Sequence, residues 1–120
     1  VVSLRTTDAP AAELDRGLHA LAEARYVFSG PGSPTYALRQ WRALGLGEVL
    51  ADVVRSGGVV VLASAAAVTA GVRSIPVYEV YKVGQAPYWE DGLDVLGRLG
   101  LRAAVVPHFD NAEGGTHDTS

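Results

Sequence analysis

Residues 57–71 have the sequence GGVVVLASAAAVTAG. The apolar run from Val59 to Leu62 is followed by Ala63 and a single serine, Ser64, after which alanines follow at once. This pattern predicts a buried strand that turns directly into a helix at Ser64. A strand-to-helix turn with small neighbours is typical of a nucleophile elbow, which lifts one hydroxyl above the sheet at the positive end of the helix.

The elbow pattern is incomplete. Glycine usually lies two residues before and two residues after such a nucleophile, where this chain has Leu62 and Ala66. The alternative is that Ser64 ends a core strand and caps a short alanine-rich helix. This stretch alone leaves both interpretations of Ser64 open.

A histidine follows a second apolar run. Residues 101–106, LRAAVV, predict another buried strand, and Pro107 and His108 come directly after it. Because ligands of open α/β sheets bind beyond the carboxyl ends of the strands, Ser64 and His108 are expected at one edge. A serine beside an imidazole base suits nucleophilic catalysis, with strained dihedrals at Ser64 and a hydroxyl roughly 3 Å from the ring. The alternative is a loop histidine with a structural hydrogen bond.

The rest of the chain predicts alternating strands and helices, and therefore βαβ units with a parallel sheet. Leucines recur at helical spacing between residues 11 and 25, and Tyr36, Leu38 and Trp41 are the expected packing residues of the next helix, which ends at Gly45 and Gly47. We expect strands over 1–4, 26–28, 59–62 and 101–106, and helices over 11–25, 35–44, 48–56 and 91–99.

Three segments together resemble a known family. Residues 27–38, VFSGPGSPTYAL, look like a glycine-rich loop between a strand and a helix; residues 62–67, LASAAA, look like a Gly-x-Ser-Ala-Gly-Ala elbow with both glycines replaced; residues 106–112, VPHFDNA, are similar to a Pro-His-Phe segment. These segments resemble the peptidase E and cyanophycinase group of serine peptidases, from about residue 26 onward. The resemblance implies an α/β three-layer sandwich with a mainly parallel sheet, of the class I glutamine amidotransferase-like or flavodoxin-like kind.

The resemblance also implies roles for individual residues. Ser64 would be the nucleophile, His108 the general base, and Gly32 with Ala65 the backbone donors to an oxyanion. Pro31 replaces a glycine of the family and supplies no N–H. The oxyanion and substrate-binding positions are Gly30, Gly32, Ala65 and Asn111.

The implied activity is hydrolysis of a small peptide or amino-acid amide through an acyl-enzyme. The alternative is a catalytically inactive amidotransferase-like domain that binds a ligand or a partner in the same pocket. Retention of Ser64 and the Pro-His-Phe segment favours the hydrolase, whereas the lost elbow glycines and Pro31 favour the inactive domain.

Glu79 is the expected third member of the catalytic set, because the family places an acid after the elbow helix. The alternative is a solvated carboxylate on an alternating strand over residues 75–84, where Val77, Glu79 and Tyr81 share one face. Weaker acid candidates are Asp91, Asp94 and Asp110.

Composition restricts the protein class. The chain has 120 residues, of which 48% are hydrophobic and 19% charged, so we expect one α/β domain over residues 1–120. We expect it to be a fragment that lacks strands at both ends, whose open strand edges favour a homo-oligomer. The absence of cysteine excludes disulfides, thiolate zinc sites and the thiol nucleophile of true glutamine amidotransferases.

Charge and motifs argue against several partners. The formal net charge is −3 and no basic run is interleaved with aromatics, so we expect no nucleic-acid partner. No apolar run is long enough for a membrane span, and a cytoplasmic location is the default. We expect a small-molecule or peptide substrate and no cofactor.

Three weaker interpretations stay open. The Gly-Pro-Gly-Ser-Pro loop could cradle a phosphate or simply turn the chain, although it lacks the lysine of a P-loop. A metal site at the carboxyl end is not expected, because the spacing of its histidines and aspartates matches no metal motif. The residues of that cluster are His108, Asp110, His117 and Asp118, and the candidates for binding an acidic group are Arg73, Lys82 and Arg102.

Overall fold

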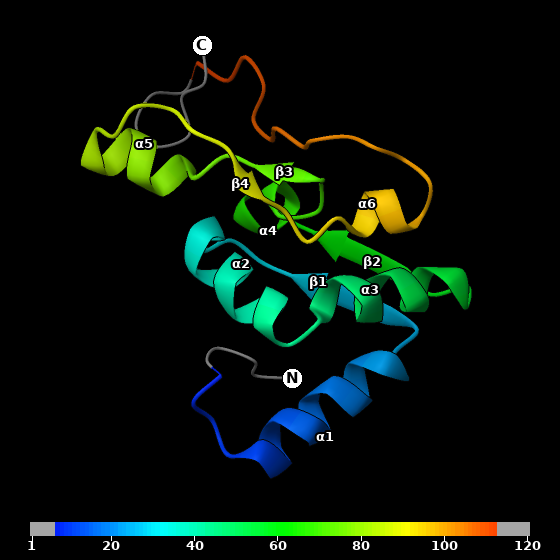
Figure 1. The fold of residues 1–120 in the computed structure, drawn as a ribbon. Coiled ribbons are helices and arrows are strands. Elements are labelled where there is room, and N and C mark those ends of the chain that lie inside the picture. The colour runs from blue at the N-terminus through cyan, green and yellow to red at the C-terminus, as the bar shows by residue number, and fades with distance from the viewer. Residues whose placement is uncertain (1–6, 113–120) are drawn as a thin grey trace.

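A short parallel ladder lies at the centre of the fold (Figure 1). In the computed structural model, which describes residues 7–112, strand β1 (Tyr26–Ser29) pairs in parallel with strand β2 (Val59–Leu62). The register runs from Tyr26 opposite Val59 to Ser29 opposite Leu62. Backbone hydrogen bonds extend the ladder at both ends, from Val59 N to the carbonyl of Arg25 and from Ala63 N to that of Ser29, each 2.9 Å. The parallel βαβ prediction is therefore confirmed for this pair.

Helices and a second, antiparallel pair complete the mixed α/β arrangement. Strand β3 (Arg73–Ser74) pairs with strand β4 (Glu90–Asp91) over two residues each. No helix of the described part of the chain has the length and apolar character needed to cross a membrane. The remaining elements are α1 (Ala11–Ala22), α2 (Pro34–Ala43), α3 (Leu46–Arg55), α4 (Ala65–Val68), β3 (Arg73–Ser74), α5 (Val77–Val83), β4 (Glu90–Asp91) and α6 (Val95–Arg98).

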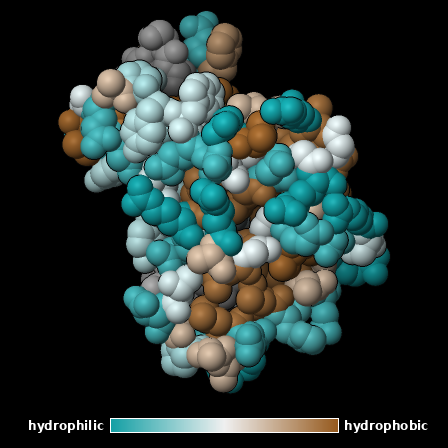
Figure 2. Space-filling model, viewed as in Figure 1, coloured by the Kyte–Doolittle hydropathy of each residue, from teal (hydrophilic) through white to brown (hydrophobic). Residues whose placement is uncertain are grey.

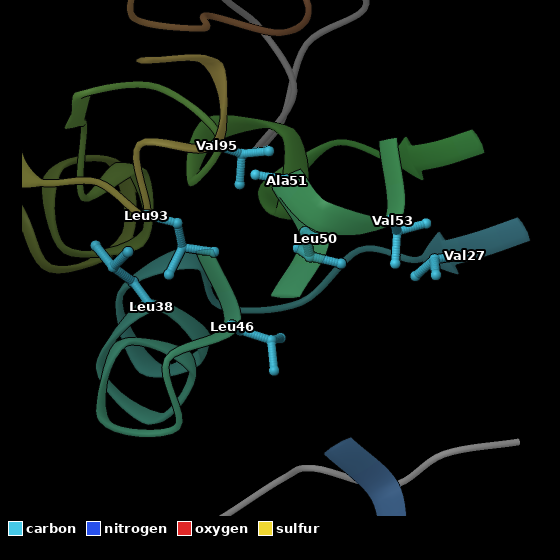
Figure 3. Close-up of a cluster of buried hydrophobic side chains, with 8 residues drawn as sticks. All are labelled: Val27, Leu38, Leu46, Leu50, Ala51, Val53, Leu93 and Val95. Atoms are coloured by element: carbon cyan, nitrogen blue, oxygen red, sulfur yellow. The ribbon is translucent and has the colours of Figure 1, made fainter. Parts of the chain in front are cut away.

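The hydrophobic core packs against one face of the central ladder (Figure 3). Val27 of β1 is buried there, with Val60 of β2 partly buried beside it. Helix α1 covers the cluster with leucines at helical spacing, as the sequence predicts. The buried cluster consists of Val27, Leu38, Leu46, Leu50, Ala51, Val53, Leu93 and Val95.

Among the described helices, α3 has the most buried residues. Leu46, Leu50 and Val53 recur every three or four residues and face the core. At its carboxyl end Gly57 has a φ of 87°, and Gly58 N donates 2.9 Å to the carbonyl of Val53. This glycine cap turns the chain straight into β2, which ends at Leu62, two residues before Ser64.

Charged side chains tie α3 to α6. The guanidinium of Arg55 donates to the carbonyl oxygen of Arg98 at 2.6 Å and to Asp52 at 2.7 Å, while Arg98 pairs with Glu48. The hydrogen bonds to Asp52 and then to Glu48 raise the pKa of Arg55 above its ordinary value. These contacts are exposed, so they orient the helices more than they stabilise them.

The opposite face of the ladder is open to solvent. Tyr26 and Phe28 of β1 are 62% and 60% exposed, and their register partners Val59 and Val61 are also exposed. Since both faces of a parallel sheet are usually covered, this face is apolar surface of the kind that associates. A separate apolar area lies between α1 and the helices α2 and α3, among hydrophilic side chains in the lower half of Figure 2.

The strand considered as the alternative for residues 75–84 is absent. Residues 77–83 form the helix α5, which begins directly after Pro76. Val77, Tyr78 and Tyr81 lie at helical spacing, so period 3.6 and not period 2 describes this segment. The strand alternative for Glu79 is therefore wrong.

Two further expectations at the carboxyl end are wrong. Residues 101–106 are extended but belong to no strand; Val72 N donates 2.9 Å to the carbonyl of Ala103 in place of a ladder. Residues 91–99 are not one helix, because Asp91 lies in β4 and Asp94, with a φ of 55°, breaks the chain before α6.

The expected packing residues of α2 are correct in part. Leu38 is buried and Trp41 packs on the core, but Tyr36 is 54% exposed and was wrongly expected to pack. Gly45 follows the end of α2 with a φ of 69°, whereas Gly47 lies inside α3. The expected strand over residues 1–4 lies outside the described residues.

Gly47 provides a test of the contact between α3 and the chain before α6. A Cβ at Gly47 would overlap the backbone carbonyl oxygen of Leu93. We expect Gly47→Ala to lower the free energy of unfolding by about 1–3 kcal/mol, measured by urea denaturation, although alanine is the better helix former. Gly32→Ala is the control, since a Cβ there meets nothing within 4 Å. An unchanged Gly47→Ala variant would contradict the close packing of α3 on Leu93.

Candidate active site

Ser64 occupies a strained turn between β2 and α4. Strand β2 ends at Leu62, helix α4 begins at Ala65, and Ser64 between them has φ 52° and ψ −114°. A non-glycine residue with this backbone costs about 1–3 kcal/mol and is found where surrounding structure holds it, often at functional sites. The turn therefore has the backbone strain expected of a nucleophile elbow.

Small residues make this turn sterically feasible. Ala65 and Ala66 are 8% and 2% exposed, and Ala66 N donates 3.1 Å to the carbonyl of Ala63. Because both positions are buried, a larger side chain at either one would require the surrounding structure to shift. The structure thus accommodates the elbow with alanine at 66, where the resembling family has glycine.

His108 reaches Ser64 from a second turn 44 residues later. The hydroxyl oxygen of Ser64 lies 3.0 Å from Nε2 of His108, which is a hydrogen-bond distance. His108 itself has a φ of 57°, and Asn111 N donates 3.2 Å to its carbonyl, which closes the turn. Through this hydrogen bond, Asn111 stabilises the turn that contains His108.

A cavity of about 400 Å³ opens beside this pair. The glycine-rich loop after β1, helices α4 and α5, and the extended segment before His108 form its walls. In Figure 1 this segment, coloured orange, crosses above α4 toward α5. The lining residues are Gly32, Ser33, Pro34, Ser64, Ala65, Val68, Ile75, Val77, Tyr78, Tyr81, Lys82, Val105, Val106, Pro107 and His108.

Two of the four predicted oxyanion and substrate-binding positions line the cavity, and two do not. Ala65 is the first residue of α4, where a backbone N–H has no intrahelical acceptor, and it lines the cavity with Gly32. Gly30 and Asn111 are not among the lining residues. Ala65 and Gly32 are therefore the two predicted donors that line the same cavity as Ser64.

Glu79 has a defined partner outside the cavity lining. The hydroxyl of Thr35, which is 3% exposed, donates 2.8 Å to Oε2 of Glu79. This hydrogen bond joins the first turn of α2 to α5. The sequence does not predict this role of Thr35, because a threonine in the first turn of a helix gives no sign of a distant partner.

The other candidate acids have structural contacts. Asp91 pairs with Arg73 across β3 and β4, and the side chain of Asp94 accepts a 3.2 Å hydrogen bond from Gly97 N as the cap of α6. Asp110, with a φ of 52°, lies in the His108 turn. Asp91 and Asp94 are thereby accounted for without a catalytic role.

Of the cationic candidates, Lys82 alone is among the cavity-lining residues of the described chain. Arg73 is paired with Asp91, and Arg102 is exposed outside the cavity lining. The lysine ammonium lies 5.0 Å from the centre of the Tyr78 ring, in cation–π range. The loop residue Ser33 caps α2, its hydroxyl accepting from Tyr36 N at 3.4 Å.

Comparison with protein-family models, with curated proteins and with solved structures found no match. The geometry of the site therefore carries the functional argument. Within residues 7–112 no group of three or more histidine, cysteine, aspartate or glutamate residues is arranged to hold a metal ion. His117 and Asp118 lie outside the described residues.

The strain at Ser64 can be measured with two variants that both remove the hydroxyl. We expect Ser64→Gly to have a free energy of unfolding about 0.5–1 kcal/mol higher than Ser64→Ala, because glycine adopts a positive φ without steric cost. Urea denaturation of the two proteins gives the difference. Equal stabilities would show that the turn is relaxed in solution.

The hydrogen bond between Thr35 and Glu79 predicts a graded response. Glu79→Ala leaves the buried hydroxyl without its acceptor and is expected to lower the free energy of unfolding by about 1–2 kcal/mol, whereas Glu79→Gln keeps an acceptor oxygen and is expected to cost less than about 0.5 kcal/mol. Denaturation measures both. Thr35→Val is the matched control, and adding Glu79→Ala to it is expected to cost little more.

Proposed function

We propose that this chain is a serine hydrolase in which Ser64 attacks a carbonyl carbon and His108 is the general base. The observation that carries the proposal is the 3.0 Å distance between Ser64 Oγ and His108 Nε2, at a residue whose backbone is held at positive φ beside a cavity. A serine hydroxyl needs such a base to become nucleophilic. The substrate class is a small peptide or an amino-acid amide.

The proposed reaction begins with proton transfer. Nε2 of His108 takes the proton of Ser64 while Oγ bonds to the carbonyl carbon and the carbonyl π electrons move onto oxygen. His108 then gives the proton to the leaving nitrogen as the carbon–nitrogen bond breaks. Water attacks the acyl-enzyme with His108 again as base, which releases the acid and restores Ser64.

The negative oxygen formed in this reaction needs preorganised donors. The N–H of Ala65, at the start of α4, and that of Gly32 across the cavity suit this task. Pro31 removes a third donor from the loop. Two donors are the usual complement of an oxyanion hole in serine hydrolases.

The proposal extends to the fold family. The peptidase E-like group, with a three-layer sandwich and a class I glutamine amidotransferase-like sheet, is our proposed family for this chain. Support comes from the parallel pair β1 and β2, the glycine-rich loop after β1, and the serine turn after β2. Their order along the chain agrees with this proposal.

A catalytically silent binding domain is the second candidate. Pro31 without an N–H and Glu79 engaged with Thr35 favour it, because both reduce the set of groups available to catalysis. The same cavity would then hold a ligand without cleaving it.

Labelling by a fluorophosphonate probe decides between the two candidates. We expect covalent modification of Ser64, detected by mass spectrometry, because a phosphonate accepts attack only from an activated serine. Ser64→Ala abolishes labelling, and His108→Ala lowers its rate by at least about 100-fold, as expected for loss of a general base.

Two controls make the labelling result decisive. Ser33→Ala removes another hydroxyl of the cavity lining and is expected to label as the parent protein does. Glu79→Gln tests the third member: retained labelling agrees with a structural role through Thr35, and lost labelling at unchanged stability supports the triad role. An unlabelled, folded parent protein would make the silent domain the better description.

A further inference from the structure

We propose that Lys82 binds the free terminal carboxylate of a peptide substrate, on the side of the leaving amino acid. This inference rests on the proposed hydrolase function and narrows its substrate class to short peptides with a free carboxyl end. The feature that carries it is the ammonium of Lys82, which lines the cavity of Ser64 and His108 among described side chains that include no carboxylate.

The cavity has a single permanent charge on the walls that the structure describes. Of the described residues that line it, Lys82 is the one permanent cation. The ion pairs found within residues 7–112 do not include this lysine. His108 is neutral when it accepts a proton as a base. The potential of the cavity is therefore positive, which favours an anionic group of a substrate.

A hydrogen bond between two helices leaves the charge of Lys82 without compensation from its own helix. Glu79 lies three residues before Lys82 in α5, a spacing at which an acid and a base pair on a helix surface. Its Oε2 instead accepts the hydroxyl of Thr35, from α2, at 2.8 Å. Glu79 is also outside the cavity lining. The one carboxylate of α5 is thus directed to α2 and not to the lysine.

The ring of Tyr78 positions the lysine ammonium. Nζ of Lys82 lies 5.0 Å from the centre of this ring, which comes four residues earlier in α5 and also lines the cavity. A ring face attracts the cation through its π electrons, but it has no carboxylate oxygen to accept the N–H groups in a charged hydrogen bond. The ammonium therefore has donors available for a carboxylate that enters the cavity.

The exposure of the lining residues indicates which part of the substrate meets Lys82. Tyr78, Lys82 and His108 are exposed, whereas Ala65 and Val68 of α4 are buried. The leaving nitrogen must lie beside His108 to receive its proton, so the leaving amino acid lies in the exposed part of the cavity, where Lys82 also lies. A carboxylate bound there keeps part of its hydration and avoids the full cost of burying a charge.

The size of the cavity favours a carboxylate close to the bond that is cleaved. A volume of about 400 Å³ is in the lower part of the range of small-molecule sites. When the leaving part of a peptide is one amino acid, only its Cα separates the carboxylate from the leaving nitrogen. Peptides that lose their last residue are therefore the expected substrates, and blocking the carboxyl end as an amide removes the group that Lys82 binds.

The test compares alanyl-alanine with alanyl-alanine amide, in which the same peptide bond is cleaved. We expect kcat/KM to be about fivefold higher for the free dipeptide at low salt, the upper end for an exposed ion pair. Lys82→Gln removes the charge and is expected to bring this ratio close to one. Raising the ionic strength from about 0.02 M to about 0.5 M is expected to lower the ratio of the parent protein at least about twofold. Arg102→Gln, at an exposed cation outside the lining, is the matched control and keeps the ratio.

A second pair of substrates distinguishes the two sides of the cleaved bond. Aspartyl-alanine amide and asparaginyl-alanine amide differ by a carboxylate on the acyl side, and Lys82→Gln is expected to leave their ratio unchanged. A preference for the aspartyl substrate that Lys82→Gln removes would place the bound carboxylate on the acyl side and overturn this inference. Urea denaturation of Lys82→Gln shows whether the variant is folded as the parent protein is.

The outcomes separate this inference from the proposed function. Equal hydrolysis of alanyl-alanine and its amide, or a ratio that falls equally in Lys82→Gln and Arg102→Gln, overturns the role of Lys82 and leaves the hydrolase intact. Labelling of Ser64 by the fluorophosphonate without hydrolysis of either dipeptide also overturns only the substrate assignment. No hydrolysis together with no labelling overturns the hydrolase, and with it this inference.

Discussion

The parallel register of β1 and β2 is the constraint on which the site depends. Because Ser29 lies opposite Leu62, the chain leaves both strands at the same edge, and the backbone hydrogen bond from Ala63 to Ser29 holds the two exits together. The glycine-rich loop follows one strand and the serine turn follows the other. If β1 shifted by one residue against β2, the loop that contains Gly32 would move relative to Ser64.

This edge is supported from the core side. Helix α3 ends at a glycine cap that feeds directly into β2, and Val53 and Val27 are buried beneath the ladder. The strained Ser64 thus lies between the hydrogen-bonded ladder of β1 and β2 and the buried alanines of α4. The ladder on one side and the packing on the other explain how a serine keeps a backbone conformation that an isolated turn would abandon.

Much of this arrangement follows from local sequence. The run of valines before Ser64 and the alanines after it predict a strand, a turn and a helix, and each is present at those residues. The glycine-rich loop and the leucine spacing of α1 are equally local signals. The sequence predicts that Ser64 and His108 lie together because both follow apolar runs, and in the structure they are at hydrogen-bond distance.

The parts that sequence patterns do not predict depend on distant contacts. Val77 to Val83 alternates well enough for a strand, but Pro76 and the contact of Glu79 with Thr35 favour a helix there. Residues 101–106 have strand composition, yet their neighbour is the Gly71 turn, where a side chain would collide with Ala103. The secondary structure of these two segments depends on which other part of the chain packs against them. The spacing of apolar residues within a segment does not show this.

Ser64 and His108 are held by different numbers of contacts with the rest of the fold. Ser64 is anchored by a ladder and a core, whereas His108 ends an extended segment that contacts the chain through Val72 and Ala103 and closes its turn at Asn111. Segments with few buried contacts open locally at lower free energy than the whole domain unfolds. On heating, the segment that ends at His108 would therefore separate from Ser64 while the core stays folded. The site would lose its serine–histidine contact at a lower temperature than the domain unfolds.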